Sequence, residues 1–303
     1  MLKNRKDEFP KIKIRNFVIK QNVKELINRY NINYVGVAKG VCADTRIVSS
    51  MIDSGIKTIG DSRIKNLKKI NKHFNVKTML LRIPMISEAD DVVKHSDYSL
   101  NSEQKVLEKL SEEARKQHKI HKPIIMVDVG DRREGVLPEN LIQFLKKVKN
   151  LPNLEITGIG SNLGCFGGIL PTKKNKQILI DLVEEAENEL DLKLPIISGG
   201  SSIELKMLEQ NKLPEKINQL RIGEAILLGT SVSQNRDIPY LRQDAFEIEA
   251  EIIELKKKPS KPEGKTGKDA FGEKPEFQDK GIRKRSEERR VGKECRSRWS
   301  PYH

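Results

Sequence analysis

The stretch YVGVAKG, residues 34–40, decides the fold of this chain. Its first five residues are small or mostly apolar, as expected of a strand buried in a parallel sheet. A lysine, Lys39, stands last, where the chain leaves the strand. In a barrel of parallel strands this point lies at the catalytic rim, where a desolvated lysine can act as a nucleophile or base. The alternative is a surface lysine just past a strand.

The same kind of unit repeats along the chain, with strand-like runs alternating with stretches of helical apolar spacing. The predicted strands are 34–38, 56–60, 78–83, 97–100, 123–129, 154–160, 194–197 and 219–222, and the predicted helices between them are 44–54, 62–73, 87–94, 102–118, 137–149, 172–191 and 202–211. A strand-like run at 9–14 and a helical pattern at 16–30 precede them. This alternation predicts an α/β fold, a (β/α)8 TIM barrel. An open doubly wound sheet is the alternative, but no dinucleotide-binding glycine fingerprint follows the first strand.

The pattern changes after the eighth predicted strand. Residues 246–255 alternate like one long strand, and residues 259–281 are rich in proline, glycine and charge. We therefore expect the barrel over residues 1–235, the start of a truncated C-terminal β domain over 236–285, and a tail over 286–303. The tail resembles a translated sequencing-adapter or vector read-through, so that the natural chain is expected to continue past residue 285. A disordered basic tail is the alternative.

Composition narrows the class of protein. The chain has 303 residues, a net charge of +14 and three cysteines, which have no CxxC spacing and fit a reducing compartment. No run of 18 apolar residues and no N-terminal signal segment occur, so that we expect a cytoplasmic protein without membrane association. Lysines spread over helix-like stretches argue against a nucleic-acid partner. The histidines show no metal-site spacing, and we predict no metal.

Polar residues stand at the end of each predicted strand or directly after it, at positions that share one face of a barrel. They are Lys39, Asp61, Arg82, Asn101, Asp128, Asp131, Arg133, Ser161, Asn162, Ser198, Arg221 and Glu224. Each has a structural alternative: Asp61 could cap the next helix, and Gly199 with Gly200 could form a plain turn. Polar groups at every strand end are harder to explain by structure alone.

The loops after the seventh and eighth predicted strands indicate a phosphate site, as in many barrels. They read SGGSS at 198–202 and RIGE at 221–224. Glycines let backbone N–H groups approach an anion, serines add hydroxyl donors, and the predicted helix at 202–211 adds its dipole. A phosphate cradle with a lysine across the barrel mouth fits a phosphorylated aldehyde cofactor, pyridoxal 5′-phosphate (PLP), with Lys39 as its Schiff-base partner.

Ten stretches in this order then match one family. They are VAKGVCAD (37–44), GDSRIKNLKK (60–69), MLLRIPM (79–85), SLNSE (99–103), IIMVDVGDRREG (124–135), GIGSNLGCFGG (158–168), PIISGGSS (195–202), LRIGEAILLG (220–229), KPSKPEGKTGKDAFG (258–272) and DKGIRK (279–284). VAKG alone is a weak signal, but the ordered set is specific. The chain resembles the barrel-fold PLP enzymes that include alanine racemase, and most closely their alanine/ornithine racemase branch.

The resemblance implies a PLP-dependent amino-acid racemase that removes and returns the Cα proton of ornithine, or of another small or basic amino acid such as alanine or lysine. Lys39 would hold the cofactor and act as one base, and Arg133 would lie near the cofactor hydroxyl and the substrate carboxylate. Arg221 would face the pyridine nitrogen; because a guanidinium only donates, it would keep that nitrogen unprotonated, which suits racemisation over transamination. Asn162 would lie against the ring. The implied phosphate residues are Ser198, Gly199, Gly200, Ser201 and Gly223.

The chain also departs from the family. Alanine racemases carry a tyrosine of the partner subunit, followed by glycine, as the second base. The matching place here is Phe271-Gly272, and phenylalanine cannot transfer a proton. Asp269 is the possible substitute. For the side-chain ammonium of ornithine, the acidic candidates are Glu224 and Asp131.

The family also implies a homodimer, because its active sites are completed by the partner's C-terminal domain. The alternative to an enzyme is a non-catalytic PLP-binding protein that consists of the barrel alone. The stretch 240–281 argues against this alternative, because such proteins end near the eighth strand.

Overall fold

The computed structural model describes residues 10–269 and 272–288, and within it eight parallel strands close into a barrel. In order around the barrel they are β2 (Asn33–Val37), β3 (Thr58–Asp61), β4 (Lys77–Leu80), β5 (Tyr98–Asn101), β6 (Lys122–Met126), β7 (Gly158–Gly160), β8 (Ile196–Ser198) and β9 (Gln219–Ile222). Pairing of β9 with β2 completes the ring. The predicted barrel is thus confirmed, and the open doubly wound sheet is excluded.

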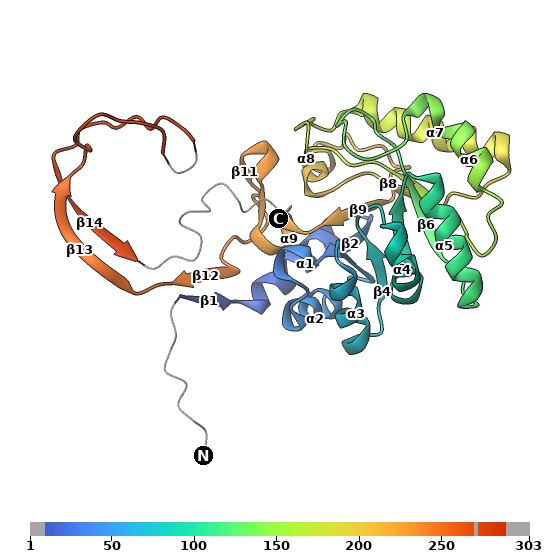
Figure 1. The fold of residues 1–303 in the computed structure, drawn as a ribbon, viewed down its shortest axis with the longest axis horizontal. Coiled ribbons are helices and arrows are strands. Elements are labelled where there is room, and N and C mark those ends of the chain that lie inside the picture. The colour runs from blue at the N-terminus through green and yellow to red at the C-terminus, as the bar shows by residue number, and fades with distance from the viewer. Residues whose placement is uncertain (1–9, 270–271, 289–303) are drawn as a thin grey trace, which may run out of the picture. The chain divides into compact units, whose positions relative to one another are not determined.

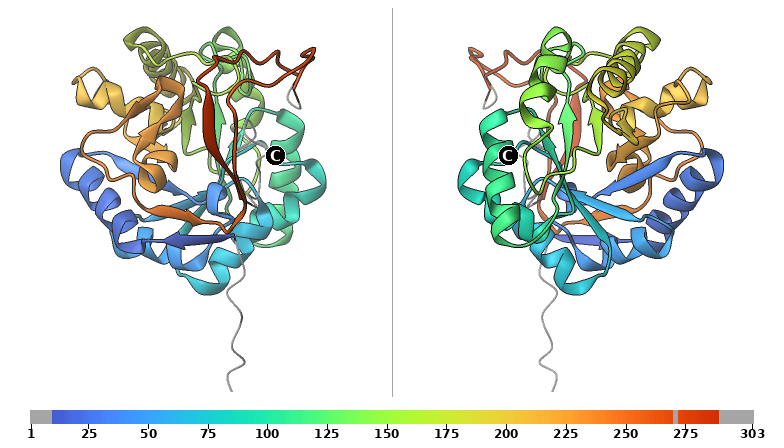
Figure 2. Two further views of the ribbon diagram at one scale, coloured as in Figure 1. Left: turned by 90° about the vertical axis from the view of Figure 1, so that its left-hand side faces the viewer. Right: turned by 90° about the vertical axis from the view of Figure 1, so that its right-hand side faces the viewer.

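Helices alternate with these strands and lie outside them (Figures 1 and 2). They are α1 (Asn16–Arg29), α2 (Thr45–Asp53), α3 (Ile64–His73), α4 (Ala89–His95), α5 (Gln104–Lys116), α6 (Leu141–Val148), α7 (Lys173–Leu190), α8 (Leu205–Glu209) and α9 (Glu224–Leu228). Short 3-10 turns are η2 (Ile86–Glu88), η3 (Pro138–Asn140) and η5 (Val232–Gln234), and β10 (Thr230–Ser231) pairs with β11 (Arg236–Asp237). In the described part of the chain, no helix has the length and apolar character that a membrane crossing needs.

One predicted helix differs in type from the prediction. Of residues 202–211, the first three form a 3-10 turn, η4 (Ser202–Glu204), and the next five form α8, so that the helical stretch ends at Glu209. The α9 helix, in turn, was not predicted. Both lie in the loops that carry the predicted phosphate site.

Alternate residues of each strand face the barrel interior, as the pleat requires. Val35, Met79, Leu100, Ile124 and Met126 form one buried interior cluster. Arg221 is the register partner of Val35. It therefore belongs to this interior set, although it is a charged residue.

A second unit contains both ends of the described chain, residues up to Arg15 and from Phe246 on. Here β1 (Lys11–Ile14) pairs antiparallel with β12 (Phe246–Glu249), and β13 (Ile252–Pro259) pairs antiparallel with β14 (Ile282–Glu288). The predicted single strand at 246–255 is therefore two strands. The domain limits predicted from the sequence and the read-through interpretation stay predictions, and residues 289–303 lie outside the described residues.

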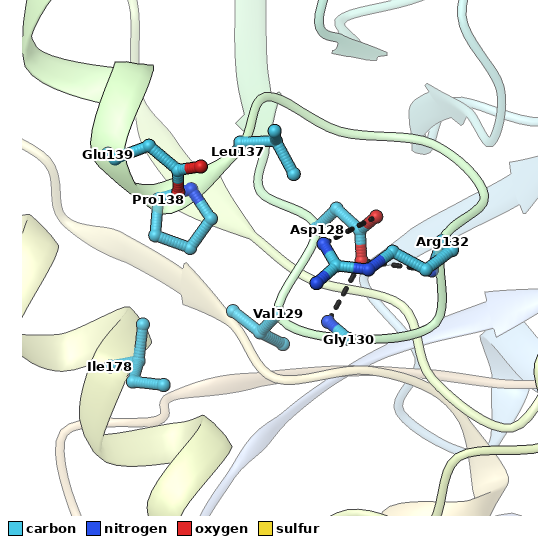
Figure 3. A pocket seen from close by; sticks show the side chains of 8 residues that line it. All are labelled: Asp128, Val129, Gly130, Arg132, Leu137, Pro138, Glu139 and Ile178. Carbon is cyan, nitrogen blue, oxygen red and sulfur yellow. Dashed lines mark hydrogen bonds and ion pairs between the residues drawn. The ribbon is translucent and has the colours of Figure 1, made fainter.

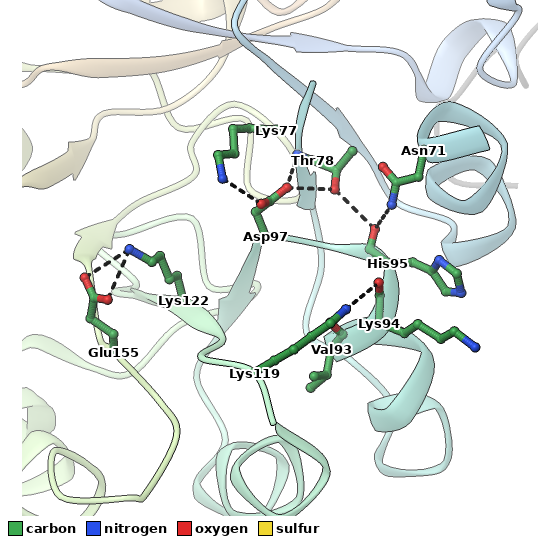
Figure 4. Close-up of polar contacts among 10 residues, drawn as sticks. All are labelled: Asn71, Lys77, Thr78, Val93, Lys94, His95, Asp97, Lys119, Lys122 and Glu155. Atoms are coloured by element: carbon green, nitrogen blue, oxygen red, sulfur yellow. Dashed lines mark hydrogen bonds and ion pairs between the residues drawn. The ribbon is translucent and has the colours of Figure 1, made fainter. Parts of the chain in front are cut away.

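Polar contacts tie together the amino-terminal ends of the barrel strands (Figure 4). Asp97 accepts hydrogen bonds from Nζ of Lys77 at 3.0 Å and from the backbone N–H of Thr78 at 2.8 Å. Nζ of Lys122, at the start of β6, lies 3.1 Å from a carboxylate oxygen of Glu155. In a barrel this end serves stability, which leaves the opposite end for chemistry.

His121, at the stability end, makes the unfolding free energy depend on pH. Its Nε2 lies 2.6 Å from Oγ of Ser99, and burial lowers its pKa to about 4. The unfolded chain takes up this proton near pH ~6.5, whereas the folded chain resists it. Acidification from neutral pH to about 4.5 should therefore cost about 2 kcal/mol through this side chain. In urea unfolding at the two pH values, the free energy of unfolding of His121→Gln should fall by about 2 kcal/mol less than that of the parent. Equal falls in the two proteins would contradict the assignment.

Candidate active site

Lys39 lies at the carboxyl end of β2, where the 3-10 turn η1 (Lys39–Val41) begins. Its side chain is half-buried. Burial, and then the positive charge of Arg133, lower the pKa of Lys39; Arg221 acts in the same direction, and Cys165 acts against it. A lysine in this environment gives up its proton more readily than one in water, as a nucleophile or base must.

Four residues from two loops form a polar network near Lys39: Arg133, Glu134, Asn162 and Cys165. Nη1 of Arg133 lies 3.2 Å from Sγ of Cys165, and Nε of Arg133 lies 3.1 Å from Oε2 of Glu134. Glu134 also accepts a hydrogen bond from the side-chain amide of Asn162 at 3.3 Å. The loop after β6 is thereby joined to the loop after β7, which brings the predicted residues Arg133 and Asn162 into one network.

Arg221 occupies the barrel interior below the rim. Its guanidinium is buried and donates to Oγ of Ser198 and, at 2.8 Å, to the carbonyl oxygen of Ser161. Burial lowers the pKa of Arg221 to about 10, while Glu134 and Glu204 raise it. The group is still protonated at neutral pH, so that it can only donate hydrogen bonds.

The turn after β8, residues 198–202, has the donor set that an anion needs. Gly200 has φ of +144°, and a Cβ there would collide with Oε1 of Glu204, so that glycine is required. In the described part of the chain, the backbone N–H groups of Gly200 and Ser201 donate to no protein acceptor. With the cation of Arg221 beside it, this set of donors fits the phosphate group of PLP.

Two other predicted phosphate residues have structural tasks in this region. The N–H of Gly199 donates to the carbonyl oxygen of Gln219 at 2.9 Å, so that it is already used within the fold. A Cβ on Gly223 would lie 2.9 Å from Cβ of Val37, so that glycine here allows close packing of β9 against β2.

The sequence misplaced some details of the site. Because β2 pairs directly with β9, Lys39 lies one strand from Arg221 and not across the barrel mouth. The dipole expected from a helix at 202–211 is weak, because a 3-10 turn and the short α8 take its place.

The two acidic candidates for a substrate ammonium hold loops in place. Asp131 is buried and accepts hydrogen bonds from the backbone N–H groups of Phe166, at 2.9 Å, and Ile169, at 3.3 Å. Glu224 accepts from the hydroxyl of Thr230 at 2.9 Å and from a backbone N–H of the same loop. Neither carboxylate needs a ligand to account for its position.

The candidate for the second base lies in the other unit. Asp269 is exposed, and its carboxylate accepts a hydrogen bond from the backbone N–H of Glu273 at 3.0 Å. Phe271, which stands where the family has its tyrosine, lies outside the described residues. The role of Asp269 stays a prediction.

Known proteins are similar to this chain in sequence or in fold. The sequence profile of the alanine racemase N-terminal domain matches residues 16–231. The chain belongs to this family. It is 43% identical over 282 residues to the ornithine racemase of Acetoanaerobium sticklandii, covering 92% of this chain and 80% of that protein. It is also 43% identical over 282 residues to the lysine racemase of Thermotoga maritima, covering 92% of this chain and 79% of that protein.

Solved structures of low sequence identity share the fold of this alanine racemase family member. An alanine racemase of Clostridium difficile 630 matches with a TM-score of 0.70 at 14% identity, over 91% of this chain and 72% of that chain. PipY of Synechococcus elongatus PCC7942 matches with a TM-score of 0.58 at 15% identity, over 69% of this chain and 99% of that chain.

Three charged residues that the sequence analysis did not single out hold the loops of this site in place. Glu134 joins the two loops described above. Lys176 of α7 and Glu204 of η4 form a buried ion pair, with Nζ 2.8 Å from Oε1. One signal was available: Lys176 falls on the apolar stripe of its helix, one turn before the buried Leu179 and Ile180.

A cavity of about 480 Å³ lies beside the loop after β6 (Figure 3). It is lined by Asp128, Val129, Gly130, Arg132, Leu137, Pro138, Glu139 and Ile178. None of these is a predicted cofactor residue. Asp128 accepts hydrogen bonds from the N–H groups of Gly130 and Arg132, which shapes the loop that presents Arg133.

Arg133 should set the pH at which Lys39 reacts. Replacing Arg133 by methionine removes a positive charge that lowers the pKa of Lys39, so that the pKa should rise. Attachment of an aldehyde needs the neutral amine, and its pH midpoint should therefore move to higher pH. Borohydride trapping of PLP on the protein over a pH series measures this midpoint. Arg132→Met, a change of the exposed neighbouring arginine, is the control and should leave it in place; an unmoved midpoint in Arg133→Met would contradict the assignment.

Proposed function

We propose that this chain is a PLP-dependent amino-acid racemase that interconverts L- and D-ornithine, or the enantiomers of a similar basic amino acid such as lysine. The observation that carries this proposal is the amine of Lys39, desolvated at the rim and one strand from the buried Arg221. The proposal is also supported by the two curated relatives at 43% identity, which are racemases of ornithine and of lysine.

Each residue of the site has a task in this proposal. PLP, when bound, supplies an aldehyde for amines and a conjugated system that stabilises negative charge at Cα. Lys39 holds the cofactor and, as a neutral amine, takes or returns the Cα proton at Nζ. The turn at 198–202 binds the phosphate through the N–H groups of Gly200 and Ser201. Arg133 binds the substrate carboxylate, because a guanidinium matches a carboxylate in charge and geometry.

Arg221 sets the direction of the chemistry. As a cation fixed by Ser198 and Ser161, it would donate a hydrogen bond to the ring nitrogen of bound PLP but would give it no proton. This role would favour racemisation over transamination. Asn162, held by Glu134 at 3.3 Å, lies against the cofactor ring in this proposal.

Three finer points belong to the same proposal. Asp269 is the group that handles the proton on the opposite face of Cα. The chain acts as a homodimer, as the resemblance to alanine racemases implies. It works in the cytoplasm. The three cysteines, which have no CxxC spacing, fit such a reducing compartment.

The second candidate function is a non-catalytic PLP-binding protein. PipY shares the fold at 15% identity, and 99% of that chain aligns with 69% of this one. Binding of PLP alone does not separate the two candidates, whereas turnover does.

The test is incubation of the PLP-loaded protein with single enantiomers of ornithine, lysine and alanine, followed by chiral chromatography. The racemase proposal expects both enantiomers of ornithine or lysine to approach an equal mixture, with alanine slower. PLP bound to the protein without formation of any opposite enantiomer would favour the second candidate. Absence of both binding and turnover would contradict both.

A further inference from the structure

The ion pair of Lys176 and Glu204 lies beneath the turn at residues 198–202. Both side chains have no exposed surface, and Nζ of Lys176 lies 2.8 Å from Oε1 of Glu204. Removing two charges from water costs free energy that a buried ion pair seldom recovers through stability alone. The burial of this pair is therefore weak evidence of a stabilising role, and its contacts with the turn carry the argument that follows.

Lys176 fixes the direction of one peptide group of the turn. Its Nζ donates a hydrogen bond to the carbonyl oxygen of Gly199 at 2.5 Å. That carbonyl and the N–H of Gly200 belong to the same planar trans peptide unit, in which the two groups point in opposite directions. Because Lys176 draws the Gly199 oxygen inward, the N–H of Gly200 must point the other way, and no protein acceptor in the described chain takes it.

Glu204 holds the same turn from its other side. Its Oε1 occupies the place where a side chain of residue 200 would begin, and Gly200 has φ of +144°. The other carboxylate oxygen, Oε2, is buried and has no hydrogen-bond partner among the described residues. The negative charge of Glu204 is thus balanced mainly by Lys176, with a further contribution from Arg221.

Charged side chains of both signs lie beneath the turn. Among the buried side chains, Lys176 and Arg221 are basic and Glu204 is acidic, and the half-buried Glu134 also acts on Arg221. With Lys176 beside it, the carboxylate of Glu204 is balanced and does not repel an anion above the turn, where electrostatic interactions are strong because water is excluded. Loss of Lys176 would leave Glu204 without its nearest cation, and the Gly199 carbonyl would keep only the longer hydrogen bond from Oγ of Ser161, at 3.4 Å.

We propose that Lys176 is a positioning residue for the phosphate group of the cofactor: it orients the Gly199–Gly200 peptide so that its N–H faces the phosphate, and it neutralises Glu204. This inference rests on the proposed PLP chemistry of the site. Neither side chain touches the reacting atoms, so that the effect falls on recognition of the phosphate and not on attachment to Lys39.

The test compares two aldehydes that differ only in the phosphate, PLP and pyridoxal. Their dissociation constants are measured by absorbance titration of the ligand-free full chain. For Lys176→Met we expect the dissociation constant of PLP to rise about 10- to 100-fold, which corresponds to losing one charge-assisted contact. The constant for pyridoxal should stay within about twofold, because pyridoxal lacks the group that the turn recognises. Inorganic phosphate should compete with PLP correspondingly less well in this variant.

For Glu204→Gln, the dissociation constant of PLP should stay the same or fall, whereas for Lys176→Met it should rise. This difference separates a positioning role from a purely structural one. Glu204→Gln keeps Lys176 and its bond to Gly199 but removes the negative charge, so that PLP should bind as tightly as in the parent or more tightly. If Lys176→Met does not fold, the double variant Lys176→Met/Glu204→Gln removes both members of the ion pair together and keeps Arg221. It should show weakened PLP binding, because the Gly199 carbonyl loses its charged donor, with unchanged pyridoxal binding. Lys174→Met and Glu185→Gln, exposed changes on the same helix, are the controls.

The outcomes distinguish a failure of the proposed PLP chemistry from a failure of the role proposed for Lys176. If the parent attaches neither PLP nor pyridoxal, the proposed function fails, and this inference fails with it. If the parent binds PLP but Lys176→Met and the double variant bind it equally well, only the inference is overturned. Equal weakening of PLP and pyridoxal, or weakening by Glu204→Gln as large as by Lys176→Met, would show a structural pair and would also overturn it.

Discussion

Replacing Lys39 by alanine should abolish racemisation, with a fall of about 10³-fold or more in kcat/KM. The side chain is the only group of the described site that combines an amine with a lowered pKa at the barrel rim. General acid–base catalysis alone contributes about 10²- to 10⁴-fold, and loss of the covalent anchor for the cofactor adds to it. The visible absorbance band of bound PLP, and its fixation by borohydride, should disappear with the activity.

The fold should survive this change, because Lys39 is half-buried and follows β2 instead of lying within it. Far-ultraviolet circular dichroism and the urea midpoint should match those of the parent. Lys57→Ala, a change of an exposed lysine that precedes β3, is the matched control and should keep full activity. Borohydride fixation of PLP to Lys39→Ala at the parent level would show that another lysine holds the cofactor.

Replacing Arg221 by glutamine should be the second most damaging change. The guanidinium donates to Ser198 and Ser161 inside the barrel, and glutamine cannot reach both acceptors or carry the charge. Buried acceptors left without donors, together with the loss of a cation beside Glu204, should lower the free energy of unfolding by about 3 kcal/mol. Racemisation should fall about 10²-fold or more, because a preorganised charge of the site is lost.

Attachment of PLP to Lys39 should persist in Arg221→Gln, although more weakly, so that activity and attachment separate. Urea unfolding, borohydride fixation and chiral chromatography measure the three quantities on one preparation. Arg115→Gln, a change of an exposed arginine on α5, should alter none of them. Near-parent racemisation by Arg221→Gln would remove this residue from the proposed chemistry.

The barrel could be predicted because its signal is local. Each βα unit carries a short apolar run and an amphipathic stripe, and eight of them in series leave few alternative folds. The strand order then places Lys39, Arg133 and Arg221 toward the same end of the barrel without any knowledge of distances.

Interactions between distant residues could not be predicted in this way. Pairing of β1 with β12 joins residues more than 200 positions apart, and no local pattern at either strand names its partner. The tasks of Asp131 and Glu224 depend on which backbone N–H groups lie near them, which sequence spacing does not give.

Lys176 shows the limit of reading charge from sequence. A lysine in a helix normally lies on a solvated face, and its stem can cover apolar surface while the ammonium stays in water. Its place on the apolar stripe with Leu179 and Ile180 indicates that this lysine is buried. Only the structure shows that Glu204 and the Gly199 carbonyl receive the charge.

The most direct test of the central claim is incubation of the PLP-loaded protein with L-ornithine in D₂O, with the product analysed by chiral chromatography and mass spectrometry. The proposed chemistry predicts D-ornithine that carries deuterium at Cα, formed by the parent and not by Lys39→Ala. Formation of D-ornithine at equal rates by Lys39→Ala, or no exchange at Cα and no D-ornithine with the loaded parent, would contradict it.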